Sequence, residues 1–306
     1  MSRPPVTLLS LAQRKQAGEP IVMVTAYDHP SAVIADEVGV DVVLVGDSAA
    51  NVVLGYGSTV PVSVAEMLML VSAVRRGLTS ALLVADLPFG SYEVSDSRAV
   101  RTAQRLVKKG GADAVKIERG GTSVRRAAAI VEAGIPVMGH VGLTPQSAAS
   151  LGGYRAQGRT ADQAEALLGD ALALQDAGCF AIVLEAVPAE VTELVVPLLD
   201  CVTIGIGAGP ATDGQVLVWH DLLGLSGPQV PRFVRAFADL RERTVAGLSA
   251  YADAVRSKEF PQAEHTYLIP DAELDALRQR LELPPNTERD DPSTLRQAQG
   301  RPSSGN

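Results

Sequence analysis

Charged side chains close several apolar runs of this sequence, where they could bind a metal ion or move a proton. Asp47 follows the run VVLVG, Asp86 ends the run ALLVAD, and Lys116 and Glu118 lie at the end of DAVKIE. Carboxylate oxygens are hard ligands that suit Mg²⁺, which keeps water molecules that a chelating substrate can replace. The pattern predicts a magnesium site made by Asp47, Asp86 and Glu118. The alternative for each carboxylate is a helix cap or a local salt bridge.

Lys116 and Glu118 are two residues apart on a predicted strand, so both side chains face the same side of it. Val115 and Ile117 then face the other side, towards the outer helices. A buried lysine is costly unless it meets an anion. We therefore expect Lys116 to contact an anionic substrate group, and the alternative is a structural ion pair with Glu118.

Two further polar residues lie at the ends of apolar runs. His140 lies near the end of PVMGHV, where it could donate a hydrogen bond to a substrate oxygen or serve only as a structural hydrogen bonder. Glu185 closes AIVLE, where loss of water around its carboxylate would strengthen it as a general base. The alternative for Glu185 is a salt bridge to Arg155 or Arg159.

These residues can meet only if the fold brings several strand ends together. Runs rich in Val and Ile predict buried strands, and amphipathic segments between them predict helices, several of which end at a glycine. Strands alternating with helices predict an α/β fold of the (β/α)8 TIM barrel type, in which all strands end at one rim. The predicted strands cover residues 21–27, 42–47, 81–86, 113–118, 136–141, 180–185, 201–207 and 216–221, and the predicted helices include 31–39, 64–77, 96–111 and 162–178.

The chain divides into a predicted barrel domain, residues 1–268, and a C-terminal extension, residues 269–306. The barrel is followed by extra helical sequence, and the extension is expected to form a short helix before a flexible, disordered tail. Past Leu283 the sequence is polar and rich in Pro and Ser, so it cannot bury enough apolar surface to order itself. The Gly- and Ser-rich interval 142–161 is expected to be an active-site loop or lid, or else a disordered insertion.

Composition excludes several classes of protein. The 306 residues carry 27 Lys plus Arg against 35 Asp plus Glu, a formal charge of −8, which argues against nucleic acid as a partner. No apolar run approaches the roughly 20 residues that span a bilayer. The N-terminal apolar patch is broken by Gln13, Arg14 and Lys15, unlike a signal peptide, so we expect a cytoplasmic protein without a membrane partner.

Two other motifs are better read as structural. Cys179 and Cys201 are too few for a disulfide scaffold or a zinc site, so we expect reduced thiols. GIGAG at 205–209 has Pro210 where the third glycine of G-x-G-x-x-G belongs, so it predicts a tight turn or a close approach of backbone to ligand rather than a dinucleotide site.

Ordered motifs over about residues 6 to 267 together resemble the ketopantoate hydroxymethyltransferase family. They include LVGDS (44–48), AVKIE (114–118), GHVGLTPQS (139–147), GGYRAQGR (152–159) and LEAVP (184–188). The resemblance implies a Mg²⁺-dependent (β/α)8 barrel of the phosphoenolpyruvate/pyruvate-like superfamily. It also implies a homo-oligomer, typically a decamer, in pantothenate biosynthesis.

The implied reaction moves a one-carbon unit from the co-substrate 5,10-methylenetetrahydrofolate to a small 2-oxo acid, 3-methyl-2-oxobutanoate, and gives 2-dehydropantoate. Mg²⁺ would stabilise an enolate of the 2-oxo acid. The residues that match the family's functional positions are Asp47 and Asp86 (metal and substrate), Glu118 (metal, directly or through water), Ser48, Lys116 and His140 (substrate) and Glu185 (proposed base). Arg119 stands where the family usually has glycine, which leaves the role of Glu118 open.

Two alternatives remain at this stage. Another member of the superfamily, such as a Mg²⁺-dependent carbon–carbon lyase acting on a 2-oxo acid, would share the metal carboxylates but would not need GHVGLTPQS. A non-catalytic barrel would not need Asp47, Asp86, Lys116 and Glu185 together.

Overall fold

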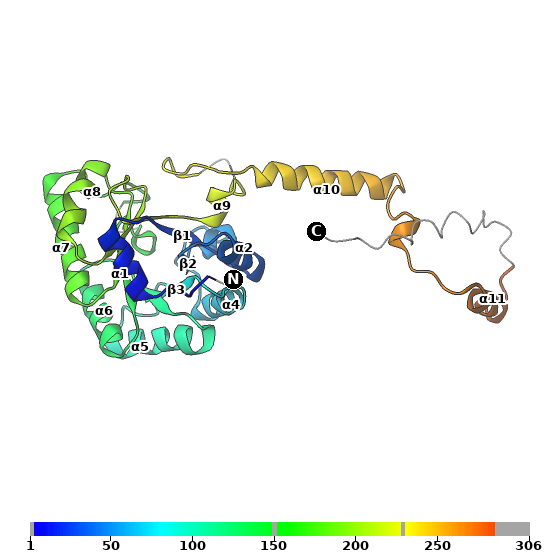
Figure 1. Cartoon of the computed structure of the whole chain (residues 1–306), viewed down its shortest axis with the longest axis horizontal. Helices are drawn as coiled ribbons and strands as arrows, with labels where there is room; N and C mark the ends of the chain where they lie inside the picture. The colour runs from blue at the N-terminus through cyan, green and yellow to red at the C-terminus, as the bar shows by residue number, and fades with distance from the viewer. Residues whose placement is uncertain (1–2, 149–151, 228–229, 285–306) are drawn as a thin grey trace. The chain divides into compact units, whose positions relative to one another are not determined.

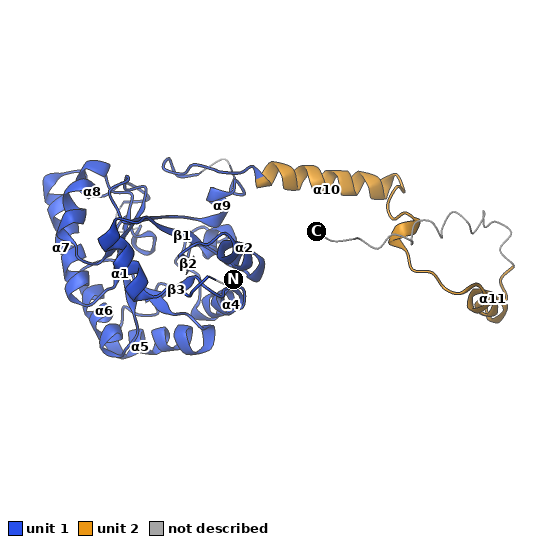
Figure 2. Cartoon of the chain, in the orientation of Figure 1, with its two compact units in different colours: residues 1–239 blue, residues 240–306 orange. Residues whose placement is uncertain are grey.

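The computed structural model describes residues 3–148, 152–227 and 230–284. The chain forms two compact units, residues 1–239 and residues 240–306 (Figure 2). The sequence placed the end of the barrel domain at residue 268, and this boundary stays a prediction. The disordered tail expected past Leu283 lies almost wholly outside the described residues.

The first unit is a closed barrel of eight parallel strands, which confirms the predicted (β/α)8 fold. Each strand pairs with the next along the chain, and β8 pairs with both β7 and β1 to close the ring. The strands are β1 (Ile21–Thr25), β2 (Val42–Val45), β3 (Leu82–Asp86), β4 (Ala114–Lys116), β5 (Val137–Gly142), β6 (Ala181–Glu185), β7 (Val202–Ile206) and β8 (Gly214–Leu217).

Helices surround the strands (Figure 1). Several begin at a Ser, Thr or Asp whose side chain accepts a backbone N–H of the first turn, as Ser63 does for α4 and Thr160 for α7. The helices of this unit are α1 (Leu8–Ala17), α2 (His29–Glu37), α3 (Ala49–Val52), α4 (Val64–Arg75), α5 (Asp96–Arg105, followed by a π-helical turn, Leu106–Gly110), α6 (Thr122–Glu132), α7 (Ala161–Asp176), α8 (Ala189–Val195) and α9 (Trp219–Leu222).

Apolar side chains of the strands form two separate cores. One fills the barrel and includes Met23, Met138 and Ile204, and the other lies between strands and helices and includes Val115 and Ile117. The alternation of inward and outward side chains along a strand produces these two layers. It confirms the predicted outward direction of Val115 and Ile117.

The predicted eighth strand was misplaced. It was expected over residues 216–221, but β8 covers Gly214–Leu217, and Trp219 and His220 belong to the short helix α9. The backbone N–H of Trp219 donates to the Thr25 hydroxyl of β1 at 2.8 Å. With this bond the chain leaves the sheet just after β8. The apolar residues of VLVWHD continue beyond the end of the strand, which is why the sequence pattern predicted a longer one.

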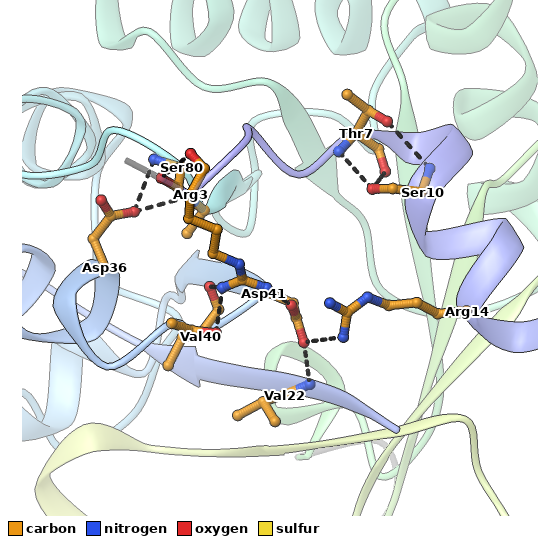
Figure 3. A network of polar contacts seen from close by, with 11 residues as sticks. Arg3, Thr7, Ser10, Arg14, Val22, Asp36, Val40, Asp41 and Ser80 are labelled. Atoms are coloured by element: carbon orange, nitrogen blue, oxygen red, sulfur yellow. Dashed lines mark hydrogen bonds and ion pairs between the residues drawn. The ribbon is translucent and has the colours of Figure 1, made fainter. Parts of the chain in front are cut away.

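At the base of the barrel, where the strands begin, aspartates accept backbone N–H groups and so connect neighbouring segments of the chain (Figure 3). Asp41, just before β2, accepts the N–H of Val22 in β1 at 2.9 Å and contacts the guanidinium groups of Arg3 and Arg14. Asp36 of α2 accepts the N–H of Ser80 at 2.9 Å. Each carboxylate therefore ties its own segment to a neighbouring one.

The same device recurs before two other strands. Asp113 precedes β4 and accepts the N–H of Leu83 in β3 at 2.8 Å. Asp213 precedes β8 and accepts the N–H of Thr203 in β7 at 2.7 Å, while Lys15 lies 2.9 Å from the same carboxylate. Since a buried N–H must find an acceptor, these aspartates also fix the register of adjacent strands.

The second unit contains α10 (Leu240–Arg256), a single 3-10 turn (Ala263–His265) and α11 (Asp271–Arg280), and neither α-helix has a buried residue. Across the described residues, no helix combines the length and apolar character needed to cross a membrane.

Candidate active site

The mouth of the barrel, where the strands end, contains a cavity of about 130 Å³. Every site residue predicted from the sequence lines it. They are Asp47 and Ser48 after β2, Asp86 of β3, Lys116 of β4, Glu118 after β4, His140 of β5 and Glu185 of β6. A larger groove of about 1670 Å³ adjoins the cavity, and the two share Glu185, Pro231 and Phe233.

Asp47 and Asp86 lie side by side and are almost fully buried. Asp86 Oδ2 accepts the backbone N–H of Asp47 at 2.9 Å. Gly46 makes this approach possible, because a Cβ there would lie 2.8 Å from the Ser48 hydroxyl and 3.5 Å from Asp86 Oδ2. The end of β2 therefore needs a residue without a side chain just before its aspartate.

Lys116 is the buried cation of this cluster. Its Nζ lies 2.9 Å from Asp86 Oδ1, 3.6 Å from Glu118 Oε1 and 3.4 Å from His140 Nδ1. Burial opposes the charged form, but Asp86, Glu118 and Asp47 outweigh it and raise the pKa of Lys116, so the side chain is an ammonium. The ion pair with Glu118 exists, but the nearer partner is Asp86.

His140 lies between two glutamates. Its Nδ1 is 3.3 Å from Glu118 Oε1, and its Nε2 is 3.2 Å from Glu185 Oε2. Burial and Lys116 oppose a charged imidazole, yet hydrogen bonds to Glu118 and Glu185 raise the pKa of His140 to about 9. The raised pKa favours the imidazolium form, although Nε2 makes no hydrogen bond of normal geometry and Nδ1 also lies 3.4 Å from the Lys116 ammonium.

Glu185 has another partner than the sequence alternative suggested. Within residues 152–227 and the other described ranges, no ion pair joins Glu185 to Arg155 or Arg159, and the closest charged group is His140. The Glu185 side chain keeps 16 % of its surface exposed, the largest share among the charged groups paired here. It is therefore the carboxylate of this cluster that is most open to a bound molecule.

Arg119 adopts a φ of 75°, a left-handed backbone conformation that glycine takes without strain. Its backbone N–H donates to the carbonyl of His140 at 2.9 Å. A left-handed backbone at this position explains why the family that the sequence resembles usually has glycine here. In this chain Arg119 adopts the same conformation, just after β4.

The donor set fits a divalent cation held by few protein ligands. Burial raises the pKa of Asp47 well above its ordinary value, with repulsion from Glu118 and Asp86 adding to it, and burial also raises the pKa of Asp86. Asp86 Oδ1 lies near Lys116 but has no hydrogen bond of normal geometry. A cation beside Asp47 and Asp86 would offset both the cost of burying their charges and the repulsion between the carboxylates.

Glu118 is engaged by the protein itself. Its Oε1 faces Lys116 and His140, and its Oε2 accepts the backbone N–H of Gln146 at 3.0 Å. In the part of the chain that the structure describes, no three His, Cys, Asp or Glu side chains surround one metal position. Asp47 and Asp86 are therefore the carboxylates left for a cation, and their hard oxygen atoms are ligands that suit Mg²⁺.

Three buried residues at the mouth were not singled out from the sequence. The Tyr27 hydroxyl lies 2.8 Å from the Ser48 hydroxyl. Gln146 donates to Asp47 Oδ2 at 2.8 Å, and Tyr92 donates to Gln146 Oε1 at 2.6 Å. The segment LTPQS that contains Gln146 was noticed as a motif, but no local pattern indicates a partner 99 residues away.

Comparison with known proteins gives consistent results over most of the chain. The family model of ketopantoate hydroxymethyltransferase matches residues 5–263. A protein of Moorella thermoacetica named 3-methyl-2-oxobutanoate hydroxymethyltransferase is 56 % identical over 262 residues, 86 % of this chain and 97 % of its own. A protein of Frankia alni with the same name is 53 % identical over 85 % of this chain and 86 % of its own.

Solved structures show a similar fold at low identity. A 2,3-dimethylmalate lyase of the PEP mutase/isocitrate lyase superfamily has a TM-score of 0.55 and 16 % identity, over 89 % of this chain and 98 % of its own. A phosphonopyruvate hydrolase in complex with oxalate and Mg²⁺ has a TM-score of 0.55 and 13 % identity, over 90 % of this chain and 95 % of its own. These likenesses support the fold, which is a (β/α)8 barrel.

Proposed function

This chain belongs to the ketopantoate hydroxymethyltransferase family, and we propose that its barrel mouth transfers a hydroxymethyl group from 5,10-methylenetetrahydrofolate to 3-methyl-2-oxobutanoate. The product is 2-dehydropantoate, a precursor in pantothenate biosynthesis. The observation that carries the proposal is the convergence of Asp47, Asp86, Lys116, His140 and Glu185 around one small cavity. Relatives that are 50–56 % identical carry the corresponding name.

Binding of the 2-oxo acid would use the positive and polar groups of the cavity. The Lys116 ammonium and the Ser48 hydroxyl line the cavity and can contact a carboxylate or keto oxygen. Asp47 and Asp86 would hold Mg²⁺, with Glu118 acting through water or through Lys116. When bound, Mg²⁺ would draw electron density from the keto and carboxylate oxygens of the substrate and stabilise the negative charge that forms on proton loss.

Glu185 is the proposed base. Its Oε2 lies 3.2 Å from His140 Nε2, so the ring would hold the carboxylate in place and leave the other oxygen for the proton on C3 of the substrate. As Glu185 takes the proton, the C3 electron pair forms a bond to the methylene carbon of the donor, and the bond from that carbon to one folate nitrogen breaks. Water then adds to the same carbon and supplies the hydroxyl oxygen as the bond to the other folate nitrogen breaks. The proton held by Glu185 and one proton of the water go to the two nitrogens, and tetrahydrofolate is the second product.

Assembly and location extend the proposal. From the family likeness we expect the chain to assemble into a homo-oligomer, typically a decamer. We also expect it to reside in the cytoplasm. Multi-angle light scattering of the purified full chain measures the oligomer mass directly. A monomer at micromolar concentration would contradict the assembly but leave the proposed reaction standing.

The decisive experiment is an assay with Mg²⁺, 3-methyl-2-oxobutanoate and 5,10-methylenetetrahydrofolate, with the product identified by mass spectrometry. We expect 2-dehydropantoate, and no product when either Mg²⁺ or the folate is omitted. The lyase in the structural comparison supplies the competing reaction. Absence of transfer together with cleavage of 2,3-dimethylmalate would replace the proposed function with a lyase activity.

A further inference from the structure

Gln146 is a buried side chain at the mouth whose hydrogen bonds reach two of the acidic residues. It lies on the short turn Pro145–Ser147 after β5 and is 5 % exposed. Its side-chain Nε2 donates to Asp47 Oδ2 at 2.8 Å, and its backbone N–H donates to Glu118 Oε2 at 3.0 Å. One residue thus contacts carboxylates that come from two different strand ends.

The orientation of the Gln146 amide is determined by its neighbours. Nε2 faces two acceptors, Asp47 Oδ2 and the backbone carbonyl of Leu87 at 3.0 Å. Oε1 accepts the hydroxyl proton of Tyr92 at 2.6 Å. With the amide reversed, an oxygen would face two oxygens and the amino group would face the hydroxyl, so only one orientation satisfies all three contacts.

Tyr92 holds the Gln146 side chain in this orientation. Its side chain is 1 % exposed, so its hydroxyl must find partners within the protein. It donates to the Gln146 side chain, whose backbone N–H in turn donates to Glu118 Oε2. Asp47, Gln146, Tyr92 and Glu118 therefore form one continuous hydrogen-bonded chain.

We propose that Gln146, held by Tyr92, is a positioning residue that fixes the Asp47 carboxylate for cation binding. The Gln146 bond engages Asp47 Oδ2 and so determines which way Oδ1 points. This inference rests on the proposed Mg²⁺-dependent function for its role in the reaction. It goes further by assigning the control of Asp47 to residues that do not touch substrate.

The first test examines the Asp47 side chain without any metal, so its outcome does not depend on the proposed function. The variant Gln146→Met keeps a similar side-chain volume and removes the amide donor. In metal-free crystals we expect Asp47 to leave its parental rotamer or to occupy more than one. An unchanged, single Asp47 rotamer in the folded variant would overturn the proposal.

The second test measures Mg²⁺ affinity by calorimetry with 3-methyl-2-oxobutanoate present. Loss of a hydrogen bond to a metal ligand typically weakens binding by about 10–100-fold, and we expect this for Gln146→Met. Tyr92→Phe, which removes only a hydroxyl, should weaken binding in the same direction by a smaller factor. If Gln146→Met does not fold, Tyr92→Phe carries both tests.

Gln175 provides the matched control. It is also a glutamine that bridges segments, since its Oε1 accepts the backbone N–H groups of Asp200 and Cys201 at 2.7 and 3.1 Å. Neither of these partners lines the cavity, whereas Gln146 donates to Asp47, which does. Gln175→Met should lower thermal stability and leave the Mg²⁺ affinity unchanged. Equal Mg²⁺ affinities in Gln146→Met and Gln175→Met would overturn the proposal. A parental chain that lacks hydroxymethyl transfer would instead refute the proposed function, and the crystallographic test would still decide the role of Gln146.

Discussion

The two ends of the barrel use the same residue type in opposite ways. At the base, Asp41, Asp113 and Asp213 each accept a backbone N–H from the preceding strand and face an arginine or lysine. At the mouth, Asp47 and Asp86 lie together beside one shared lysine. Carboxylates that each face their own cation stabilise a fold, whereas crowded carboxylates that share one lysine retain affinity for a further cation.

The contrast predicts that mouth variants lose function and base variants lose stability. Enzymes commonly keep destabilising groups where chemistry needs them, so the two properties can be separated by mutation. The four variants below test this separation.

The largest effect is expected for Glu185→Gln, which removes the proposed base but keeps the shape of the side chain. Deuterium exchange at C3 of 3-methyl-2-oxobutanoate, followed by NMR, should slow by about 10²–10⁴-fold, while Mg²⁺ still binds. The control is Glu193→Gln on an exposed position of α8 that lines neither the cavity nor the groove. Exchange at the parental rate in Glu185→Gln would remove Glu185 as the base.

Asp47→Asn should weaken Mg²⁺ binding without weakening the fold. Loss of a ligand charge should cost more than the roughly 10–100-fold that follows loss of an outer-shell partner. Repulsion among Asp47, Asp86 and Glu118 falls at the same time, so the free energy of unfolding should stay equal or rise. Calorimetry and urea unfolding measure the two quantities. A large loss of stability would contradict the contrast between mouth and base.

At the base, Asp41→Asn should lower the stability of the fold and leave activity unchanged, the reverse of what is expected at the mouth. The variant weakens the acceptor of the Val22 N–H and removes the charge that faces Arg3 and Arg14. Loss of such buried contacts costs about 1–3 kcal/mol in the free energy of unfolding. Urea unfolding measures this loss, and kcat per folded molecule should not change. A fall in kcat at full folding would show that the base also controls the mouth.

The smallest effect concerns pH, where the two ends should differ in sign. The pKa of Asp47 is raised, so its contribution to stability is full below the ordinary value and is lost as pH rises through the folded pKa. For Asp36, burial opposes ionisation, but hydrogen bonds from Thr79, Ala81 and Ser80 lower the pKa. Its contribution is present above the ordinary value and is lost as pH falls through the folded pKa.

Unfolding measured in urea from pH 3 to pH 8 tests these signs. Relative to the parental chain, Asp47→Asn should gain stability as pH rises, and Asp36→Asn should lose it as pH rises from the acid end. Parallel curves for the two variants would mean that the mouth and the base do not differ electrostatically.

Sequence patterns predicted the fold because each strand and helix of the barrel has a local signature. The runs of Val and Ile placed β1 to β7, and the two-residue spacing of Lys116 and Glu118 placed both side chains inside. The bounds predicted for the eighth strand were wrong because the strand ends where Trp219 bonds to Thr25, a contact that local apolar character does not reveal.

The site was predictable in part for the same reason. Strand ends converge in a parallel barrel, so Asp47, Asp86 and Glu185 could be expected at one mouth. Gln146 and Tyr92 escaped notice because their roles arise from contacts between segments far apart in the chain. Neutral polar residues also carry no charge pattern that would mark them.

The base aspartates have a consequence for how the ring could be opened. Asp41 joins β2 to β1, Asp113 joins β4 to β3, and Asp213 joins β8 to β7. A circular permutant with its new ends between β4 and β5 would keep these three connections, and that between Asp36 and Ser80, within continuous chain. New ends between β1 and β2 would place Val22 and Asp41 at opposite termini, so the bond between them would have to form late in folding.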